Sequence, residues 1–343
     1  MKIVADDKIP YIKGVLEPYA QVVYLSGNRI GAEDVADADA LLVRTRTRCN
    51  EALLNGSAVR LVATATIGTD HIDSAWCAAH GIETVSAPGC NAAGVLQWVS
   101  AVLADAVSGA GRRPDDIVLG VVGVGHVGSL VERYARSWGF RVLCSDPPRE
   151  LAEHLGREEG FVPFEELVAA SDIITFHVPY TYDGPFPTCG LAGREFFATI
   201  KRGTLILNAS RGGVVDEDAL KRALIEGRCS AGIDTWSGEP RIDTELLGLV
   251  RYATPHIAGY SVQGKANASA AVVSAVAHRF GLPIDGCYPP NVVRVNLTEI
   301  DWVRMCSEVG GYFDVNAQSH ALKASPQLFE SFRENYMFRE EFF

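Results

Sequence analysis

The stretch DIVLGVVGVGHVGSLVERYARSWGFRVLCSD, residues 116–146, decides the fold. Its first apolar run, Ile117–Val122, is typical of a buried strand and leads directly into GVGHVG, a GxGxxG loop. A helical pattern follows, and a second strand-like run ends in Asp146, eighteen residues after Gly128. This order of strand, glycine loop, helix and strand predicts the opening unit of a doubly wound sheet that binds a dinucleotide.

Each glycine of the loop has a mechanical reason to be glycine. Gly123 allows the tight turn, Gly125 lets the main chain approach a pyrophosphate, and Gly128 lets the helix pack close to the strand. The alternative is an ordinary βα turn that binds nothing. We predict that a dinucleotide contacts Gly123, Gly125, His126, Val127, Gly128 and Asp146.

The identity of the dinucleotide depends on Asp146. Its carboxylate can accept hydrogen bonds from both hydroxyls of the adenosine ribose and would repel a 2′-phosphate, which favours NAD over NADP. Arg149, close by, is the feature that speaks against this preference.

Short β-branched runs alternate with longer helical patterns over most of the chain. Four candidate strands precede the long alanine-rich stretch that follows Pro88, and six begin after it. We therefore predict an α/β protein with two doubly wound parallel-sheet domains, one Rossmann-like and one flavodoxin-like, and a small C-terminal α+β appendage. The predicted boundaries are 1–92 with 262–282 for a discontinuous substrate-binding domain, 93–261 for the NAD-binding domain, and 283–343 for a C-terminal segment.

Composition excludes several classes of function. The 343 residues carry a formal net charge of −11, which argues against a general nucleic-acid binder. No secretory signal or membrane-spanning apolar run is visible in the sequence. The eight cysteines are scattered and form no CxxC pair, so they support neither a zinc site nor a disulfide framework. We expect a cytoplasmic protein without a metal.

Three residues with complementary chemistry follow successive candidate strands in the second half of the chain. Arg211 follows TLILNAS, Glu239 lies in DTWSGEP, and His256 lies in TPHIAGY. In open α/β sheets, ligands bind at the carboxyl ends of the strands, where these residues would converge. Arginine grips a carboxylate, histidine accepts a proton, and a neighbouring glutamate orients the imidazole. Alone, each residue has a structural explanation; Arg211, for example, could pair with Asp216.

The motifs GVGHVG, NASRGGVVD, DTWSGEP and TPHIAGY together resemble the D-isomer-specific 2-hydroxyacid dehydrogenases. The resemblance implies that Arg211 binds the substrate, that Glu239 is the acidic partner and that His256 transfers the proton. It also implies a homodimer formed through the C-terminal segment. Further cofactor contacts are implied at Val178, Ala209, Ser210, Arg211, Asp234 and Gly259, and substrate contacts at Thr45, Thr66 and Tyr260.

A narrower resemblance concerns the substrate. TATIGTDHID, SAPGCNAAGV, CSDPPR, PHIAGYSVQGKA and RENYMFRE are similar to family members that oxidise 4-phospho-D-erythronate with NAD. The product is (R)-3-hydroxy-2-oxo-4-phosphobutanoate, on the pyridoxine (vitamin B6) route to pyridoxal 5′-phosphate. One alternative is the same chemistry on 3-phosphoglycerate, glyoxylate or hydroxypyruvate. Another is an NAD-sensing interaction protein, but such a protein would not need arginine, glutamate and histidine together.

The substrate phosphate has candidate partners in the loop VRTRTRCN. Arg44, Arg46 and Arg48 alternate, so in an extended segment they would share one face and Thr45 would point the other way. At most one of these sets would then face the ligand. We take Arg44 and Arg46 as candidate phosphate contacts. A solvated basic edge that discourages strand pairing is the equal alternative.

Overall fold

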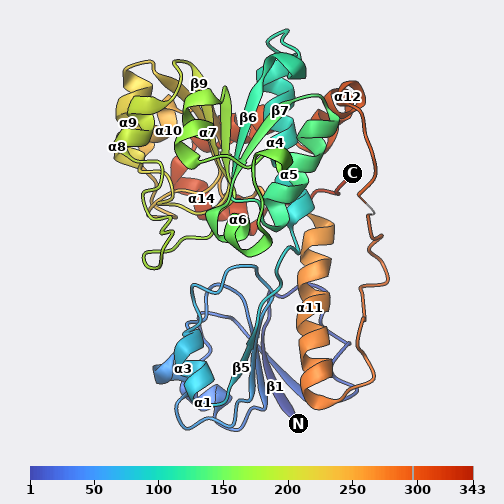
Figure 1. Ribbon diagram of the computed structural model, residues 1–343. Coiled ribbons are helices and arrows are strands. Elements are labelled where there is room, and N and C mark those ends of the chain that lie inside the picture. The colour runs from blue at the N-terminus through green and yellow to red at the C-terminus, as the bar shows by residue number, and fades with distance from the viewer. Residues whose placement is uncertain (296, 343) are drawn as a thin grey trace. The chain divides into compact units, whose positions relative to one another are not determined.

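The computed structural model describes residues 1–295 and 297–342, and the chain divides into two compact units (Figure 1). Unit 1 comprises Met1–Asn91 with Ser261–Val295, and unit 2 comprises Ala92–Tyr260 with Asn296–Phe343. The sequence predicts that the chain passes from one unit to the other after residues 92 and 261. Residues 283–343 do not form a unit of their own, because their first part packs in unit 1 and the rest in unit 2.

Unit 1 contains a five-stranded parallel sheet in the order β2-β1-β3-β4-β5. This is the flavodoxin-like order that the sequence predicts. The strands are β1 (Lys2–Asp6), β2 (Gln21–Leu25), β3 (Ala40–Val43), β4 (Leu61–Thr64) and β5 (Glu83–Val85). Strand β5 is not among the strands predicted from the sequence, because three residues are too few to show a period. The helices are α1 (Ala32–Val35), α2 (Glu51–Leu54), α3 (Ser74–Ala79) and α11 (Val262–Phe280).

The centre of this sheet is buried on both faces, as expected for parallel strands with crossover helices. Every residue of β3 and β4 is buried, and such uninterrupted apolar runs are typical of covered parallel sheets. Val272 and Val276 of α11 pack in one core with Ile3 and Leu42. The late helix therefore completes a domain that begins at the N-terminus.

Unit 2 contains a six-stranded parallel sheet in the order β11-β10-β9-β8-β6-β7. All six strands that the sequence predicts are present: β6 (Val118–Val122), β7 (Arg141–Ser145), β8 (Ile173–Phe176), β9 (Thr204–Asn208), β10 (Cys229–Ile233) and β11 (Tyr252–Ala253). The order reverses beside β6, whose neighbours are β7 and β8. That reversal is the point at which doubly wound sheets bind dinucleotides.

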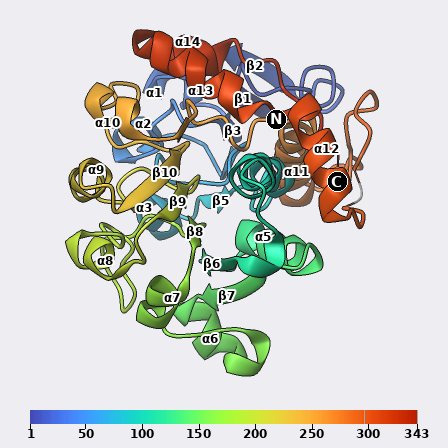
Figure 2. The ribbon, with the colours of Figure 1, turned by 90° about the horizontal axis from the view of Figure 1, so that it is seen from above.

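Helices cover both faces of the second sheet (Figure 2). One face carries α4 (Ala92–Leu103), α5 (His126–Ser137) and α12 (Trp302–Tyr312). The other carries α7 (Phe164–Ala170), α8 (Arg194–Thr199), α9 (Glu217–Ile225) and α10 (Thr244–Leu249). A further helix, α6 (Pro147–Glu153), follows β7. Within the part of the chain that the structure describes, no helix has the length and apolar character needed to cross a membrane.

The part of the C-terminal segment in residues 297–342 belongs to the core of unit 2. In residues 297–342 it forms α12, α13 (Val315–Ala324) and α14 (Phe329–Glu334) but no strand, so it is helical where the sequence predicts α+β. The Trp302 ring packs on Trp138 and Phe140, with centroids 5.7 and 5.2 Å apart. The hydroxyl of Ser319 in α13 accepts the Ala253 N–H at 3.0 Å and so covers the edge strand β11. Aromatic and edge contacts explain why the segment joins this unit.

Candidate active site

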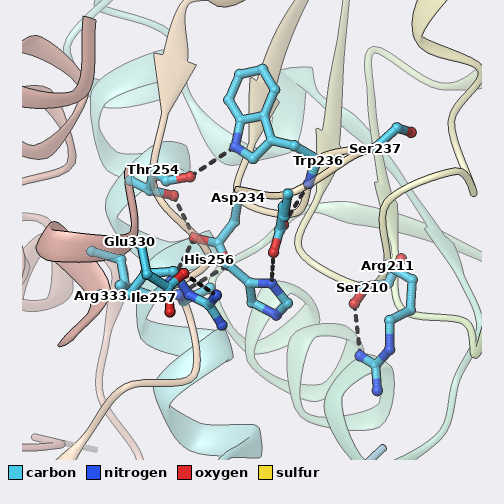
Figure 3. Close-up of polar contacts among 12 residues, drawn as sticks. Ser210, Arg211, Asp234, Trp236, Ser237, Thr254, His256, Ile257, Glu330 and Arg333 are labelled. Atoms are coloured by element: carbon cyan, nitrogen blue, oxygen red, sulfur yellow. Dashed lines mark hydrogen bonds and ion pairs between the residues drawn. The ribbon is translucent and has the colours of Figure 1, made fainter. Parts of the chain in front are cut away.

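Arg211, Glu239 and His256 lie in the loops that follow β9, β10 and β11. These strands are parallel neighbours in one sheet. Their carboxyl ends therefore meet at one edge, and the three loops emerge there together. Figure 3 shows the Arg211 and His256 side chains extending in the same general direction from their loops. The structure thus brings together the three residues that the sequence predicts as catalytic.

Glu239 holds the imidazole of His256. The His256 Nδ1 atom lies 2.8 Å from Glu239 Oε2, and Glu239 Oε1 accepts the Trp236 N–H at 2.8 Å. The His256 side chain is 34% exposed and that of Glu239 17%. Because Nδ1 is engaged by the carboxylate, Nε2 is the nitrogen that can exchange a proton with a ligand.

The carboxyl group of Glu239 is kept ionised by its partners. Burial raises its pKa, but the hydrogen bond and charge of His256, the Trp236 N–H and the charge of Arg333 outweigh burial, so the pKa is lowered. An anionic Glu239 stabilises the imidazolium form of His256 when a proton arrives.

The main chain of His256 adopts a left-handed conformation, with φ +56°. This is uncommon for a residue with a side chain, and the surroundings must hold it. The His256 N–H donates to the Asp234 carbonyl at 2.8 Å, and the Asp234 carboxylate accepts the next two N–H groups, from Ile257 at 2.8 Å and Ala258 at 3.0 Å. Asp234 therefore anchors the loop that carries His256.

Asp234 itself lies in the interior, with 1% of its surface exposed. Burial raises its pKa, although the charge of His256 and its hydrogen-bond donors oppose this effect. The Thr254 hydroxyl donates to Asp234 at 2.6 Å and accepts the Trp98 indole N–H at 2.9 Å. The structure thus gives Asp234 an anchoring role that the sequence does not suggest, while its contact with the cofactor stays a prediction.

Arg211 lies in a loop that is braced by Asn208. The Asn208 side-chain amide donates to the Arg211 carbonyl at 2.9 Å, and its oxygen accepts the Ser210 hydroxyl at 2.7 Å and the Ser210 N–H at 3.1 Å. The Arg211 guanidinium donates from Nη1 to the Ser210 carbonyl at 2.8 Å. The main chain of residues 208–211, which includes Ala209, is therefore fixed from within.

The glycine loop has the close contacts that its motif implies. Gly123 has φ +83°, and a Cβ atom there would stand 2.6 Å from Val178 Cγ1. A Cβ atom on Gly128 would overlap the Gly123 carbonyl oxygen, whereas one on Gly125 would meet nothing within 4 Å. The space beside Gly125, at the start of α5, is open, as is needed if a pyrophosphate is to approach the main chain there.

Asp146 is fixed beside the glycine loop. Its carboxylate accepts the Val124 N–H at 2.7 Å and caps α6 by accepting the Arg149 N–H at 3.1 Å. The Arg149 guanidinium donates to the Val124 carbonyl at 2.7 Å and pairs with Glu153 at 2.9 Å. Arg149 is thus occupied by protein groups, and Asp146 stays the predicted determinant of the cofactor.

Sequence comparison agrees with this geometry. Residues 97–258 match the model of the D-isomer specific 2-hydroxyacid dehydrogenase, NAD binding domain. Proteins named erythronate-4-phosphate dehydrogenase are similar along their length. That of Bacteroides fragilis is 43% identical over 99% of this chain and 97% of its own, and that of Porphyromonas gingivalis is 40% identical over 98% and 92%. The chain belongs to the D-isomer-specific 2-hydroxyacid dehydrogenase family.

Solved structures of this fold extend the likeness. The D-lactate dehydrogenase of Aquifex aeolicus, complexed with NAD and lactic acid, is 23% identical with a TM-score of 0.65, and the match covers 85% of this chain and all of the other. At that identity the match concerns the fold alone. The family model identifies the second sheet and its glycine loop as an NAD-binding domain.

The remaining predicted substrate contacts are divided between the units. Tyr260 belongs to unit 2, where its ring lies 6.1 Å from both Tyr336 and Phe338. Thr66 belongs to unit 1, where its hydroxyl lies 2.7 Å from that of Thr64 and donates to the Gly68 carbonyl at 3.0 Å. Gly259 lies in a turn just before Tyr260.

The arginine loop of unit 1 is not extended. Strand β3 ends at Val43, and Thr45 and Arg46 form a turn. The condition under which Arg44, Arg46 and Arg48 share one face is therefore not met. Arg44 donates from Nη1 to the Lys8 carbonyl at 3.2 Å.

The dehydrogenase site also involves residues that the sequence analysis does not single out. Arg333 of α14 acts by its charge on Glu239 and Tyr260, and Arg339 bonds to the loop after His256. Both lie within RENYMFRE, residues 333–340, a motif that carries the resemblance but implies no role for either arginine. Among the residues described, no group of three or more His, Cys, Asp or Glu side chains is placed to hold a metal ion.

Proposed function

We propose that this chain is an erythronate-4-phosphate dehydrogenase, which oxidises 4-phospho-D-erythronate to (R)-3-hydroxy-2-oxo-4-phosphobutanoate with NAD in vitamin B6 biosynthesis. The observation that carries the proposal is the pair formed by His256 and Glu239, next to the Arg211 loop and in the same domain as the glycine loop. Similarity at 43% identity over nearly the whole of the Bacteroides fragilis relative supports the choice of substrate.

Different residues of unit 2 would carry out different parts of the reaction. Bound NAD supplies the acceptor for the hydride that leaves C2 of the substrate. Arg211 grips the carboxylate through its planar donors and so orients C2. His256 Nε2 removes the proton of the C2 hydroxyl, and Glu239 stabilises the imidazolium that results. In the reverse direction the same imidazolium returns the proton to the carbonyl oxygen.

The contacts of the cofactor are part of the proposal. The glycine loop with Gly123 and Gly125, and the first turn of α5 with Gly128, would hold the pyrophosphate. Asp146 would hold the adenosine ribose. The other predicted contacts are His126, Val127, Val178, Ala209, Ser210, Asp234 and Gly259.

A second set of residues in the proposal concerns the substrate and its phosphate. The proposed phosphate contacts are Arg44 and Arg46, and the other proposed substrate contacts are Thr45, Thr66 and Tyr260. Arginine in this set suits a phosphate because its fork of donors matches phosphate oxygens. Arg44 and Arg46 would separate 4-phospho-D-erythronate from unphosphorylated 2-hydroxy acids.

We also propose a homodimer and a cytoplasmic location. The family resemblance suggests that the C-terminal segment contributes to the dimer. All eight cysteines are free thiols, which suits a reducing compartment. The mass in solution, measured by light scattering, tests the dimer.

A substrate panel tests the activity. NADH formation is followed with 4-phospho-D-erythronate, 3-phosphoglycerate and D-erythronate, and NADH consumption with glyoxylate and hydroxypyruvate. We expect 4-phospho-D-erythronate to have the highest kcat/KM and D-erythronate to be lower by at least about a hundredfold, because its phosphate contacts are lost. A higher kcat/KM on 3-phosphoglycerate would replace the proposed substrate. NADH binding without turnover of any acid would favour a sensor.

A further inference from the structure

Arg339, four residues before the end of the chain, is a buried cation that bonds to main-chain carbonyls. It is 7% exposed. Its Nη1 atom donates to the carbonyls of Ile257 and Tyr260, both at 3.0 Å, and its Nη2 atom donates to the carbonyl of Ala258. Three carbonyls of one short loop thus converge on a single guanidinium group. That loop begins with His256.

The same guanidinium extends beyond the loop. Nη2 also donates to the Gly94 carbonyl in the first turn of α4, at 2.8 Å, and the guanidinium carbon lies 4.4 Å from the centre of the Phe313 ring. Both contacts are within unit 2. Arg339 is therefore held by α4 and by the residue that follows α12, and is not a mobile end of the chain.

Asp234 and Arg339 hold complementary groups of the same loop. The Asp234 carboxylate accepts the N–H groups of Ile257 and Ala258, whereas Arg339 takes the carbonyl groups of the same two residues. A buried anion and a buried cation therefore satisfy the donors and the acceptors of one irregular segment. Hydrogen bonds to charged groups are stronger than those between neutral groups. Together with the bond from the His256 N–H to the Asp234 carbonyl, this arrangement holds the segment in which His256 has its left-handed main chain.

The neighbours of Arg339 act on the other end of the loop. The Nη1 atom of Arg339 donates to the Tyr336 hydroxyl at 3.2 Å. The ring centroids of Tyr336 and Phe338 each lie 6.1 Å from that of Tyr260. The segment from Tyr336 to Arg339 thus fixes both the main chain and the ring of Tyr260.

We propose that Arg339 is a positioning residue for the dehydrogenase reaction: by binding the carbonyls of Ile257, Ala258 and Tyr260 it sets the direction of the His256 imidazole. This inference rests on the proposed function. It assigns the C-terminal segment a part in catalysis within one chain, independent of any part in a dimer.

The test compares full-length Arg339→Ala, Arg339→Lys and Arg304→Ala. Arg304 is the matched control, because it lies in the same segment, on α12, with a side chain that is 63% exposed and paired with Glu308. For Arg339→Ala we expect kcat to fall at least about tenfold, as a small displacement of a reacting group suffices for this, while the dissociation constant of NADH changes less than about threefold. Guanidinium ion should restore part of the lost kcat. Arg304→Ala should match the wild type.

A second measurement does not depend on turnover. Hydrogen exchange of the peptide that contains residues 256–260 should be faster in both Arg339 variants and unchanged in Arg304→Ala, with peptides of the first sheet unaffected. Arg339→Lys retains the charge but not the fork of donors, so it serves if Arg339→Ala does not fold. The inference is overturned if kcat is unchanged in Arg339→Lys, or if kcat, NADH affinity and protection of the whole chain fall together. If the wild type shows no turnover, the proposed function is contradicted and not the role of Arg339. Hydrogen exchange would then still measure the effect of Arg339 on residues 256–260.

Discussion

Gly212 lies against the main chain of Trp236, so closely that a Cβ atom on Gly212 would overlap the Trp236 carbonyl oxygen and stand 2.9 Å from the Ser237 nitrogen. Trp236 in turn donates its N–H to Glu239 at 2.8 Å. The loop that carries Arg211 is therefore in backbone contact with the loop that orients His256. We expect the distance between Arg211, the proposed carboxylate-binding group, and the pair formed by His256 and Glu239 to depend on this contact.

Substitution Gly212→Ala tests the contact. The main chain cannot yield as a flexible side chain would, so the two loops must separate. We expect kcat/KM to fall at least about tenfold in the NAD reduction assay. Gly248→Ala in α10 is the control, because a Cβ atom there meets nothing within 4 Å and alanine favours a helix. Equal activities of the two variants would show that the loop spacing is not critical.

Glu239→Gln tests the role of the anion beside His256. Glutamine keeps the shape of the side chain but removes the charge that stabilises the imidazolium. We expect the acidic limb of the kcat/KM profile for oxidation to move to lower pH by about one unit, and the maximal kcat to fall. His256→Gln should abolish the limb together with most of the activity, while NADH still binds. If the acidic limb of the pH profile does not move in Glu239→Gln, a group other than the pair of His256 and Glu239 controls that limb.

The ionisation of Glu239 also affects stability. Its pKa in the folded chain is lowered, chiefly through His256 and the Trp236 N–H acting against burial. A lowered pKa stabilises the folded state above the ordinary carboxyl range, and this contribution disappears as the pH falls through the folded-state pKa. We expect the difference in free energy of unfolding between wild type and Glu239→Gln to shrink towards low pH, as measured by urea unfolding at several pH values. A difference that does not change with pH would contradict this.

Arg333→Gln should have the opposite effect on the pH profile. Arg333 is largely buried, with a side chain that is 21% exposed, and it donates to Glu330 at 3.2 Å (Figure 3). Its charge acts on Glu239, so its removal makes the imidazolium of His256 more favourable. We expect the acidic limb to move to higher pH. Glu330→Gln, on the same helix, should move it to lower pH, and a shift of both variants in one direction would exclude a charge effect.

The strength of local signals explains what could be predicted from the sequence. The strand Thr204–Asn208 and the loop with Arg211 are adjacent in the chain, so one motif reports both. The contacts of Arg339 with Ile257 and Ala258 join residues about eighty positions apart, and no local pattern records them. The alternating arginines suggest an extended run, but the structure has a turn at Thr45. Alternation describes the spacing of residues along the chain and does not fix the backbone conformation.

Asp146→Ser tests the choice of cofactor. Serine can still cap α6 but lacks the charge that would repel a 2′-phosphate. We expect the ratio of kcat/KM for NAD to that for NADP to fall at least about tenfold, mainly through better use of NADP. Adding Arg149→Gln to Asp146→Ser should remove part of the gain in the use of NADP. When Asp146 is replaced, Arg149 is the nearby cation whose guanidinium can leave Glu153 and bind the 2′-phosphate. If the ratio stays at the wild-type value in Asp146→Ser, the preference for NAD has its origin in another part of the loop.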